Sequence, residues 1–314
     1  MTDGADAGVL GIDVGGTTVK ARLVGPDGVV LASWREPTPQ DDHAASVLAE
    51  VVATIAVDAI ARGRASGTDL GAIGFVVPGV VDDPSGTVLL AVNLGWRDVP
   101  VRDVVAARLA AVGIGVPIAF GQDVRAGALA EARSGAAADH GGTVAFVAVG
   151  TGLAAALVTD RRVVGAHAWA GEIGQVVLTV GPHAGRRVEE IASASAVARR
   201  AGAPDARAVA DRVRAGDAEA RAVWDECVDV LADALAWTTV VGGCATIVVG
   251  GGLAGADDLL TGPLAAGLEQ RLPGVRVPEV VVAVHGDGAA AIGAAAMAAD
   301  LLLRPRDAPT DVSS

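Results

Sequence analysis

The chain has 314 residues, enough for two domains of roughly 150 residues each, and 52% of its residues are hydrophobic. Its net charge of -13 disfavours contact with a phosphate backbone and so argues against a nucleic-acid partner. No apolar run reaches the roughly 18 residues of a membrane span, and no basic region with a following apolar stretch opens the chain, so we expect a cytoplasmic protein without a membrane partner.

The N-terminal part alternates short apolar runs with glycine turns and helical patterns. This alternation is typical of an α/β fold. The two cysteines, Cys227 and Cys244, are too few and too far apart for a disulfide framework or a CxxC metal site, so both are expected to be buried free thiols. In chain order we expect strands at 9–12, 19–24 and 29–32, a helix at 42–62, a strand at 71–77, a helix at 101–111, a strand at 117–120 and a helix at 124–133.

A second segment repeats the plan of the first strands. "LGIDVGGTTVKARLV" and "VAFVAVGTGLAAALV" each run from an apolar strand through a Gly-Thr turn into another apolar strand, which suggests two domains built on related units. The last residues, 304–314, are polar and proline-containing and are expected to be disordered. Between the second strand-turn-strand segment and this tail we expect helices at 188–201, 206–215 and 218–241, a strand at 245–249, a helix at 257–271, a strand at 280–284 and a helix at 289–303.

The segment "GIDVGGTTVK" indicates a phosphate-binding turn. Gly15 and Gly16 have no side chains, so the backbone can approach a phosphate closely, and Asp13 at the end of the strand could hold Mg²⁺ or its water shell. A different glycine pattern, "VVGGGLAG", fits the dinucleotide-binding motif GxGxxG, but no acid ends the next predicted strand, where a ribose would be bound. A dehydrogenase is therefore disfavoured, and a glycine loop that packs against a ligand or strand is the simpler interpretation.

Asp123 lies between a predicted strand and a predicted helix in "FGQDVRAGALAEA". Such a carboxylate can cap the helix, or it can act as a general base toward a substrate hydroxyl. Asn93 and Asp98, in "VNLGWRDVP", are of the residue types that hydrogen-bond sugar hydroxyls, although Asn and Asp in glycine-containing loops are more often turn formers.

The order of the motifs is more specific than any one of them. "DVGGTT", "PGVVD", "NLGW", "QDVRAGALAE", "VGTGLAAAL", "GAHAWAGEIGQ", "VVGGGLA" and "GDGAAAIGAAAMA" together resemble the ROK family of bacterial sugar kinases and repressors, over nearly the whole chain. The resemblance implies an actin-like, hexokinase-like (ribonuclease H-like) fold of two α/β domains with an interdomain cleft. We place residues 1–122, with the helix at 289–303, in the N-terminal domain and residues 123–288 in the C-terminal domain.

The resemblance also implies a reaction. Family enzymes transfer the γ-phosphoryl group of ATP to a hexose hydroxyl, usually O6, with Mg²⁺. By position, Asp123 matches the catalytic base, and Asp13 would hold Mg²⁺ indirectly. The residues implied for ATP are Asp13, Gly15, Gly16, Thr17, Gly150, Thr151, Gly152, Gly250, Gly251 and Gly252; those implied for the sugar are Gly79, Asn93, Gln122, Asp123, Glu172, Gln175 and Glu189.

The chain departs from the family pattern at several positions. Gln122 and Arg125 stand where the family usually has asparagine, and Ala154 and Ala155 replace glycines after the second turn, which should make that turn stiffer. Family members commonly have a histidine at the position of Gln175 and a following CxCGxxGC segment that bind a structural zinc. The segment from Gln175 to Glu189 has no cysteine, and zinc requires four N or S ligands, so no structural zinc is expected. Arg186, Arg187 and Glu190 are expected to form a solvated face around a turn.

Three functions remain open at this point. The favoured one is an ATP-dependent hexose kinase, with glucose preferred as substrate, N-acetylmannosamine, fructose, mannose or allose as alternatives, and polyphosphate as an alternative donor. A catalytically weak relative that binds sugar or nucleotide is suggested by the departures from the family pattern, at Gln122, Arg125, Gln175, Ala154 and Ala155. A sugar-responsive repressor is disfavoured because only eight residues precede Val9, too few for a helix-turn-helix. Relatives suggest a homodimer.

Overall fold

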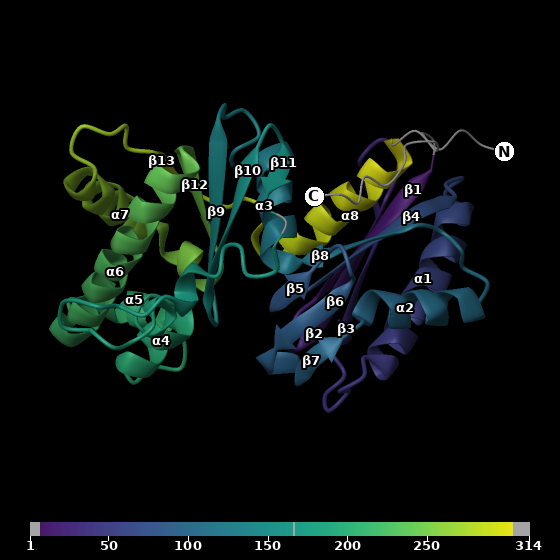
Figure 1. Cartoon of the computed structure of the whole chain (residues 1–314), viewed down its shortest axis with the longest axis horizontal. Helices are drawn as coiled ribbons and strands as arrows, with labels where there is room; N and C mark the ends of the chain where they lie inside the picture. Colours follow the sequence, from purple (N-terminus) through teal and green to yellow (C-terminus); the bar gives the residue numbers. More distant parts are fainter. Residues whose placement is uncertain (1–6, 166, 304–314) are drawn as a thin grey trace. The chain divides into compact units, whose positions relative to one another are not determined.

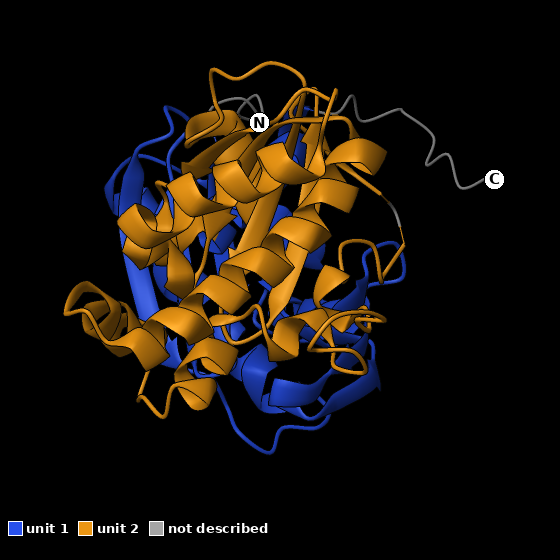
Figure 2. Ribbon diagram, turned by 90° about the vertical axis from the view of Figure 1, so that its left-hand side faces the viewer, with its two compact units in different colours: residues 1–126, 290–314 blue, residues 127–289 orange. Residues whose placement is uncertain are grey.

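The structure, a computed structural model, describes residues 7–165 and 167–303, so the expected disordered tail at 304–314 lies outside the described residues. The chain divides into two compact units (Figure 2): residues 1–126 with 290–314, called unit 1, and residues 127–289, called unit 2. The division falls after Ala126, within the helix α3 (Asp123–Ser134), and not at the expected boundary between residues 122 and 123. The first residues of α3 therefore belong to unit 1.

Unit 1 is built on a five-stranded sheet with the order β3-β2-β1-β4-β8 (Figure 1). The first three strands form an antiparallel meander, whereas β1, β4 and β8 run parallel. Its strands are β1 (Gly8–Val14), β2 (Thr18–Val24), β3 (Val30–Pro37), β4 (Leu70–Val77) and β8 (Ile118–Gln122).

Both faces of this sheet are covered by helices because alternate residues of β1 and β4 point to opposite sides. Leu10, Ile12 and Phe75 belong to the core shared with α1 (Ser46–Ala65) and α2 (Val101–Ala111). On the other face, Gly11 and Gly74 allow α8 (Ala289–Leu303) to lie close to the sheet. A Cβ at Gly74 would lie 1.7 Å from the carbonyl oxygen of Ala294, so only glycine permits this packing.

The helix α8 also meets the length and composition of a membrane span over the window Gly286–Leu303, of which 39% is buried. An apolar window of that length therefore does exist in the chain, contrary to the sequence expectation. Three of its alanines, Ala291, Ala294 and Ala298, are fully buried, and Ala298 packs with Val9 and Ala72 of the unit 1 sheet. This packing accounts for the apolar composition of α8.

A small three-stranded sheet in unit 1 was not anticipated from the sequence. Its strands β5 (Val80–Asp82), β6 (Thr87–Ala91) and β7 (Trp96–Val99) are antiparallel neighbours. The buried indole of Trp96 donates a hydrogen bond of 2.7 Å to the carbonyl oxygen of Asp42, which fastens β7 to the segment before α1. These strands are too short for a periodicity that a sequence pattern could reveal.

Unit 2 repeats the plan of unit 1, with a five-stranded sheet in the order β11-β10-β9-β12-β13. Here β9, β10 and β11 are antiparallel, whereas β9, β12 and β13 are parallel, so the predicted repeat is confirmed in the sheet topology. Its strands are β9 (Thr143–Val149), β10 (Leu153–Thr159), β11 (Arg162–Val164), β12 (Cys244–Gly250) and β13 (Glu279–Val282).

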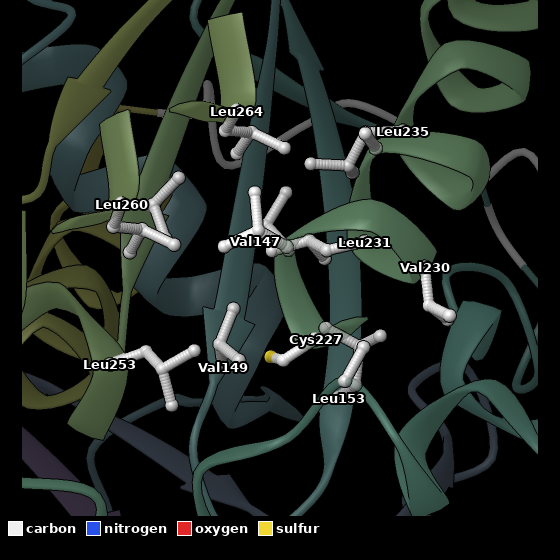
Figure 3. Close-up of a cluster of buried hydrophobic side chains, with 14 of the residues drawn as sticks. Val147, Val149, Leu153, Cys227, Val230, Leu231, Leu235, Leu253, Leu260 and Leu264 are labelled. Atoms are coloured by element: carbon white, nitrogen blue, oxygen red, sulfur yellow. The ribbon is translucent and has the colours of Figure 1, made fainter. Parts of the chain in front are cut away.

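The core of unit 2 lies between this sheet and its helices. Figure 3 shows Val147 of β9 among leucines of two helices, including Leu231 and Leu260, and all three side chains are fully buried. Cys227 lies in the same core, and burial raises the pKa of its thiol to about 12, which makes it unreactive. The helices are α4 (Ala194–Arg200), α5 (Ala206–Arg214), α6 (Ala218–Gly242) and α7 (Asp257–Arg271).

The prediction of one continuous helix at 188–201 is wrong, because the structure has two separate helical segments there. A 3-10 turn at Val188–Glu190 is followed by α4, which begins only at Ala194. The break has a local cause: the Ser193 hydroxyl accepts a hydrogen bond of 3.1 Å from the amide of Ala196, so Ser193 caps a new helix. This break puts Glu189 on a short turn.

Candidate active site

The first glycine turn connects β1 to β2 in unit 1. Its carbonyl groups are held from one side: the Thr38 hydroxyl donates to Gly15 O at 2.7 Å, and the Gln40 amide donates to Gly16 O at 3.2 Å. The backbone amide of Thr38 donates to Thr17 O at 3.1 Å. Residues far along the chain therefore fix the orientation of the peptide groups in the turn.

The amides of Gly16 and Thr17 have no acceptor within residues 7–165 and 167–303. Successive amides of this kind form a concavity that binds anions. Asp13, only 8% exposed, ends β1 beside this turn, and it lies directly across the ladder from Lys20, the only lysine of the chain. The turn thus combines donors for an anion with a carboxylate of the kind that Mg²⁺ prefers.

The glycine at position 16 has a second role, because Asn93 lies against it. A Cβ at Gly16 would lie 2.9 Å from Nδ2 of Asn93, which is closer than real Cβ contacts. Gly79, with a φ of 102°, lies against β6, where a Cβ would lie 2.3 Å from Leu90 O. The sequence-predicted residues Asp13, Gly15, Gly16, Thr17, Gly79 and Asn93 all lie in unit 1, and the structure brings Asn93 to the turn.

Gln122 and Asp123 lie where β8 ends and α3 begins. Gln122 is 5% exposed, and its Oε1 accepts a hydrogen bond of 3.1 Å from the amide of Arg125, so its side chain caps the first turn of α3. Oδ1 of Asp123 accepts a hydrogen bond of 2.8 Å from the amide of Val124. Asp123 is partly exposed, so a second group can still reach it from solvent.

Arg125 holds the start of α3 in place. Its guanidinium donates to Val81 O at 2.9 Å and forms an ion pair of 2.7 Å with Asp83. Burial raises the pKa of the Asp83 carboxyl, and the charge of Arg125 partly offsets this effect. Arg125 therefore has a specific partner in Asp83, which no local pattern indicates because the two residues are 42 positions apart in the sequence.

The second glycine turn connects β9 to β10 in unit 2 and is fixed by the start of α4. The amides of Ala194 and Ser195 donate to Gly150 O at 2.9 and 3.4 Å, and the Ser195 hydroxyl donates to Thr151 O. Ala154, predicted to stiffen the turn, lies in β10 paired with Ala148 and not in the turn itself.

Glu189 lies against this second turn. A Cβ at Gly152 would lie 3.0 Å from Oε2 of Glu189, so glycine is required for the carboxylate to approach. The segment that contains Glu172 and Gln175 lies beside β10, because the amide of Ala155 donates to Gly171 O at 2.9 Å. The predicted residues Gly150, Thr151, Gly152, Glu172, Gln175 and Glu189 are thus all in unit 2.

The glycines at 250–252 follow β12 and pack against the second turn. Gly251 has a φ of 83°, and a Cβ there would lie 2.6 Å from the backbone of Val149 at the end of β9. A Cβ at Gly252 would lie 3.2 Å from the Cβ of Ala194. The close approach of these glycines to a strand end agrees with the interpretation as a packing loop, and it leaves the backbone of Gly250, Gly251 and Gly252 beside the turn.

The described residues, 7–165 and 167–303, contain no group of three or more His, Cys, Asp or Glu side chains placed to hold a metal ion. Both cysteines are buried in unit 2, and Gln175 offers an amide side chain. The residues present therefore do not fit a tetrahedral zinc site.

The expectation that Arg186, Arg187 and Glu190 form only a solvated face is wrong for Arg187. Its guanidinium bonds both Gln175, at 2.7 Å, and Glu189, at 3.0 Å. The contact with Gln175, twelve residues earlier, depends on how the intervening segment folds, so no local sequence signal could have shown it.

Comparison with known proteins extends these findings. A glucokinase of Halalkalibacterium halodurans is 31% identical over 209 residues, which cover 62% of this chain and 59% of that protein. A glucokinase of Thermotoga maritima is 29% identical over 282 residues, which cover 82% of this chain and 85% of that protein. The crystal structure of a ROK family glucokinase from Streptomyces griseus, in complex with glucose and AMPPNP, matches with a TM-score of 0.74 and 25% identity, covering 94% of this chain and all of that one.

The chain thus spans less than two thirds of the first of these relatives and most of the second. Its two-unit α/β fold is that of the hexokinase-like, actin-like kinases. A family model described as "ROK family" matches residues 9–301. The chain therefore belongs to the ROK family.

Proposed function

We propose that the protein is an ATP-dependent sugar kinase that transfers the γ-phosphoryl group to a hexose hydroxyl, with O6 of glucose favoured. The observation that carries the proposal is the pair of glycine turns. Each ends the first strand of a repeated unit, and each has its carbonyls held by neighbouring groups, which leaves backbone amides for a phosphate. The glucokinase names of the relatives support this reaction for the present chain.

Asp123 is the proposed general base. Its carboxylate would accept the proton of the sugar hydroxyl while that oxygen forms a bond to the γ-phosphorus and the bond from phosphorus to the ADP oxygen breaks. The hydrogen bond from the amide of Val124 to Oδ1 of Asp123 fixes the carboxylate at the start of α3. This arrangement favours one orientation of the base before the sugar arrives.

The two turns would bind the phosphates through their amides. The donors of the first turn, Gly16 and Thr17, belong to unit 1, and those of the second turn, Thr151 and Gly152, belong to unit 2, because the Gly150 amide already donates to Gly152 O. Gly250–Gly252 would border the adenosine. Asp13 fits Mg²⁺, which when bound would neutralise charge on the phosphates. Phosphoryl transfer depends mainly on positioning and electrostatics, which backbone amides can supply.

The sugar would be bound by side chains that lie against the same turns. Asn93 contacts Gly16, and Glu189 contacts Gly152, so a hydroxyl bound by either side chain would be close to a phosphate-binding turn. Gly79, Gln122, Glu172 and Gln175 complete the proposed sugar set. Charged acceptors bind sugar hydroxyls more strongly than neutral ones do.

We further propose that the protein holds no structural zinc, works in the cytoplasm as a homodimer and does not bind nucleic acid. The zinc proposal rests on the missing donors, and the nucleic-acid proposal on the net charge of -13. Zinc content of the purified protein tests the first claim, and one equivalent of zinc per chain would refute it.

The catalytically weak relative remains a second candidate, since Arg125 and Gln175 replace family residues beside the proposed site. A coupled assay of ADP release, run over a panel of hexoses with Mg²⁺, separates the two functions, and a sugar-phosphate assay with polyphosphate tests the other donor. We expect turnover with ATP and a preference for glucose. No turnover on any hexose with either donor would eliminate the kinase proposal.

A further inference from the structure

The segment after Gln175 forms a short hairpin. The amide of Val188 donates to Val176 O at 2.9 Å, and the amide of Leu178 donates to Arg186 O at 2.8 Å. Gly185 N–H donates to Leu178 O at 2.8 Å and closes the loop at the far end. Backbone hydrogen bonds therefore connect the two strands of this segment, called here the 176–188 hairpin.

Arg187 lies at the base of the 176–188 hairpin and joins residues on either side of it. Its Nη1 donates to Oε1 of Gln175 at 2.7 Å and forms an ion pair of 3.0 Å with Oε1 of Glu189. Its backbone amide donates to Oε2 of Glu190 at 2.7 Å, which, together with the charges of Arg186 and Arg187, lowers the pKa of that carboxyl. One residue thus fixes both ends of the hairpin.

These contacts determine where the Glu189 carboxylate lies. One of its oxygens is bound to Arg187, and the other, Oε2, lies over Gly152 of the second turn. The side chain of Glu189 is 19% exposed, whereas that of Arg187 is 45% exposed. A carboxylate held at one oxygen keeps its other oxygen available as an acceptor.

We propose that Arg187 is a positioning residue for sugar binding. It would orient Glu189 through an ion pair and Gln175 through a hydrogen bond, in place of a metal that this donor set cannot hold. The proposal rests on the proposed kinase function, because it assigns Glu189 to a sugar hydroxyl. Nη1 serves both acceptors, and Nε lies 3.9 Å from Oε2 of Glu190, so the planar guanidinium of an arginine suits this role better than the single ammonium group of a lysine.

The first test compares Arg187→Ala with Arg186→Ala. Arg186 is the adjacent arginine, is 54% exposed and, among the described residues, forms an ion pair only with Glu190, at 3.5 Å, so it is a matched control. We expect Arg187→Ala to raise the KM for the sugar about tenfold while kcat and the KM for ATP stay within about twofold. Arg187→Lys should recover part of the loss, and Arg186→Ala should match the wild type. Equal sugar KM values for both alanine variants would overturn the proposal.

A double-mutant cycle tests whether Arg187 acts through Glu189. If it does, Arg187→Ala adds little to the sugar KM of Glu189→Gln, because the residue to be positioned has already lost its charge. Fully additive effects would contradict this route.

A third measurement needs no sugar. Hydrogen exchange of the 176–188 hairpin should be faster in Arg187→Ala than in Arg186→Ala, with equal exchange in the β9 and β10 strands. Equal exchange rates of the hairpin in the two variants would show that Arg187 does not stabilise the hairpin. If the wild type turns over no hexose, the kinase function fails, while this readout still decides whether Arg187 fixes the hairpin.

Discussion

The turn after β1 and the turn after β9 are both built from glycine and threonine, but different parts of the chain hold them in place. The first is one residue longer, with Gly15 to Thr18 between the paired Val14 and Val19, whereas only Gly150 to Gly152 lie between Val149 and Leu153. Side chains of a loop, Thr38 and Gln40, hold the carbonyls of the first turn. Backbone amides at the start of α4 hold Gly150 in the second turn.

The flanking ladder pairs differ more than the turns do. Asp13 faces Lys20 beside the first turn, whereas Ala148 faces Ala154 beside the second. The first turn therefore has charged residues in its flanking ladder, whereas the second turn takes its carboxylate, that of Glu189, from a later segment of the chain. Substitutions of the ladder side chains should affect the first turn more than the second, whereas substitutions that change the backbone shape of a turn should affect both turns.

Each unit also uses an arginine to fix the element that bears a proposed site residue. Arg125 is 7% exposed and pairs with Asp83 beneath the helix that begins with Asp123. Arg187 is 45% exposed and pairs with Glu189 directly. A buried ion pair is costly to break, and an exposed one contributes little to folding, so the first arginine should matter for stability and the second for binding.

The largest expected effect is that of Asp123→Asn, which has no counterpart in unit 2. The substitution keeps the shape of the side chain but removes the base, so kcat should fall by about 10²–10⁴, with sugar binding nearly unchanged. Steady-state kinetics and calorimetric titration with glucose measure the two quantities. Activity within tenfold of the wild type would remove Asp123 from its proposed role.

Gly16→Ala and Gly152→Ala test whether the two turns are equivalent. Each new methyl group would displace the tip of a flexible side chain, Asn93 or Glu189, rather than backbone. Stability should change little, while kcat/KM for the sugar falls by about 10- to 100-fold in both variants, since small misplacements are costly in catalysis. Gly115→Ala and Gly262→Ala are the controls, because a Cβ at either position meets nothing within 4 Å. A loss in only one turn would show that the turns differ in function.

Arg125→Met tests the buried arginine. It removes the ion pair to Asp83 and the hydrogen bond to Val81 O, so the free energy of unfolding should fall by about 2 kcal/mol. Arg62→Met breaks an exposed pair with Asp58 in the same unit and should have almost no effect. Denaturant unfolding measures both variants, and similar midpoints would contradict the distinction between buried and exposed arginines.

The smallest expected effect is on stability at acidic pH. The amide of Ala220 and the guanidinium of Arg212 lower the pKa of Asp217, the N-cap of α6 in unit 2. A carboxyl whose pKa is lower in the folded state stabilises the fold above its ordinary pKa of 3.8, and this stabilisation is lost as the pH falls through the folded-state value. The melting temperature of the wild type should therefore decrease more between pH 6 and about pH 3 than that of Asp217→Asn. Parallel curves for the two proteins would exclude Asp217 as a source of acid sensitivity.

Much of the fold was predictable because its signals are local. The helices at 101–111, 257–271 and 289–303 have the predicted bounds, and both strand-turn-strand units were identified from their glycines. The three short strands β5, β6 and β7 were not, since each depends on its neighbours more than on its own pattern. The break before α4 was also missed, although the capping residue Ser193 is visible in the sequence.

The sequence by itself determined the two repeated units, the glycine turns and the candidate residues, because strand alternation and turn chemistry are set by neighbouring residues. Only the tertiary structure decided which of these residues meet. Asn93 reaches Gly16, Asp83 pairs with Arg125, and Arg187 joins Gln175 to Glu189. These contacts depend on how the chain folds back on itself, since the length of a side chain and the place of its partner are fixed only when the intervening segments are packed.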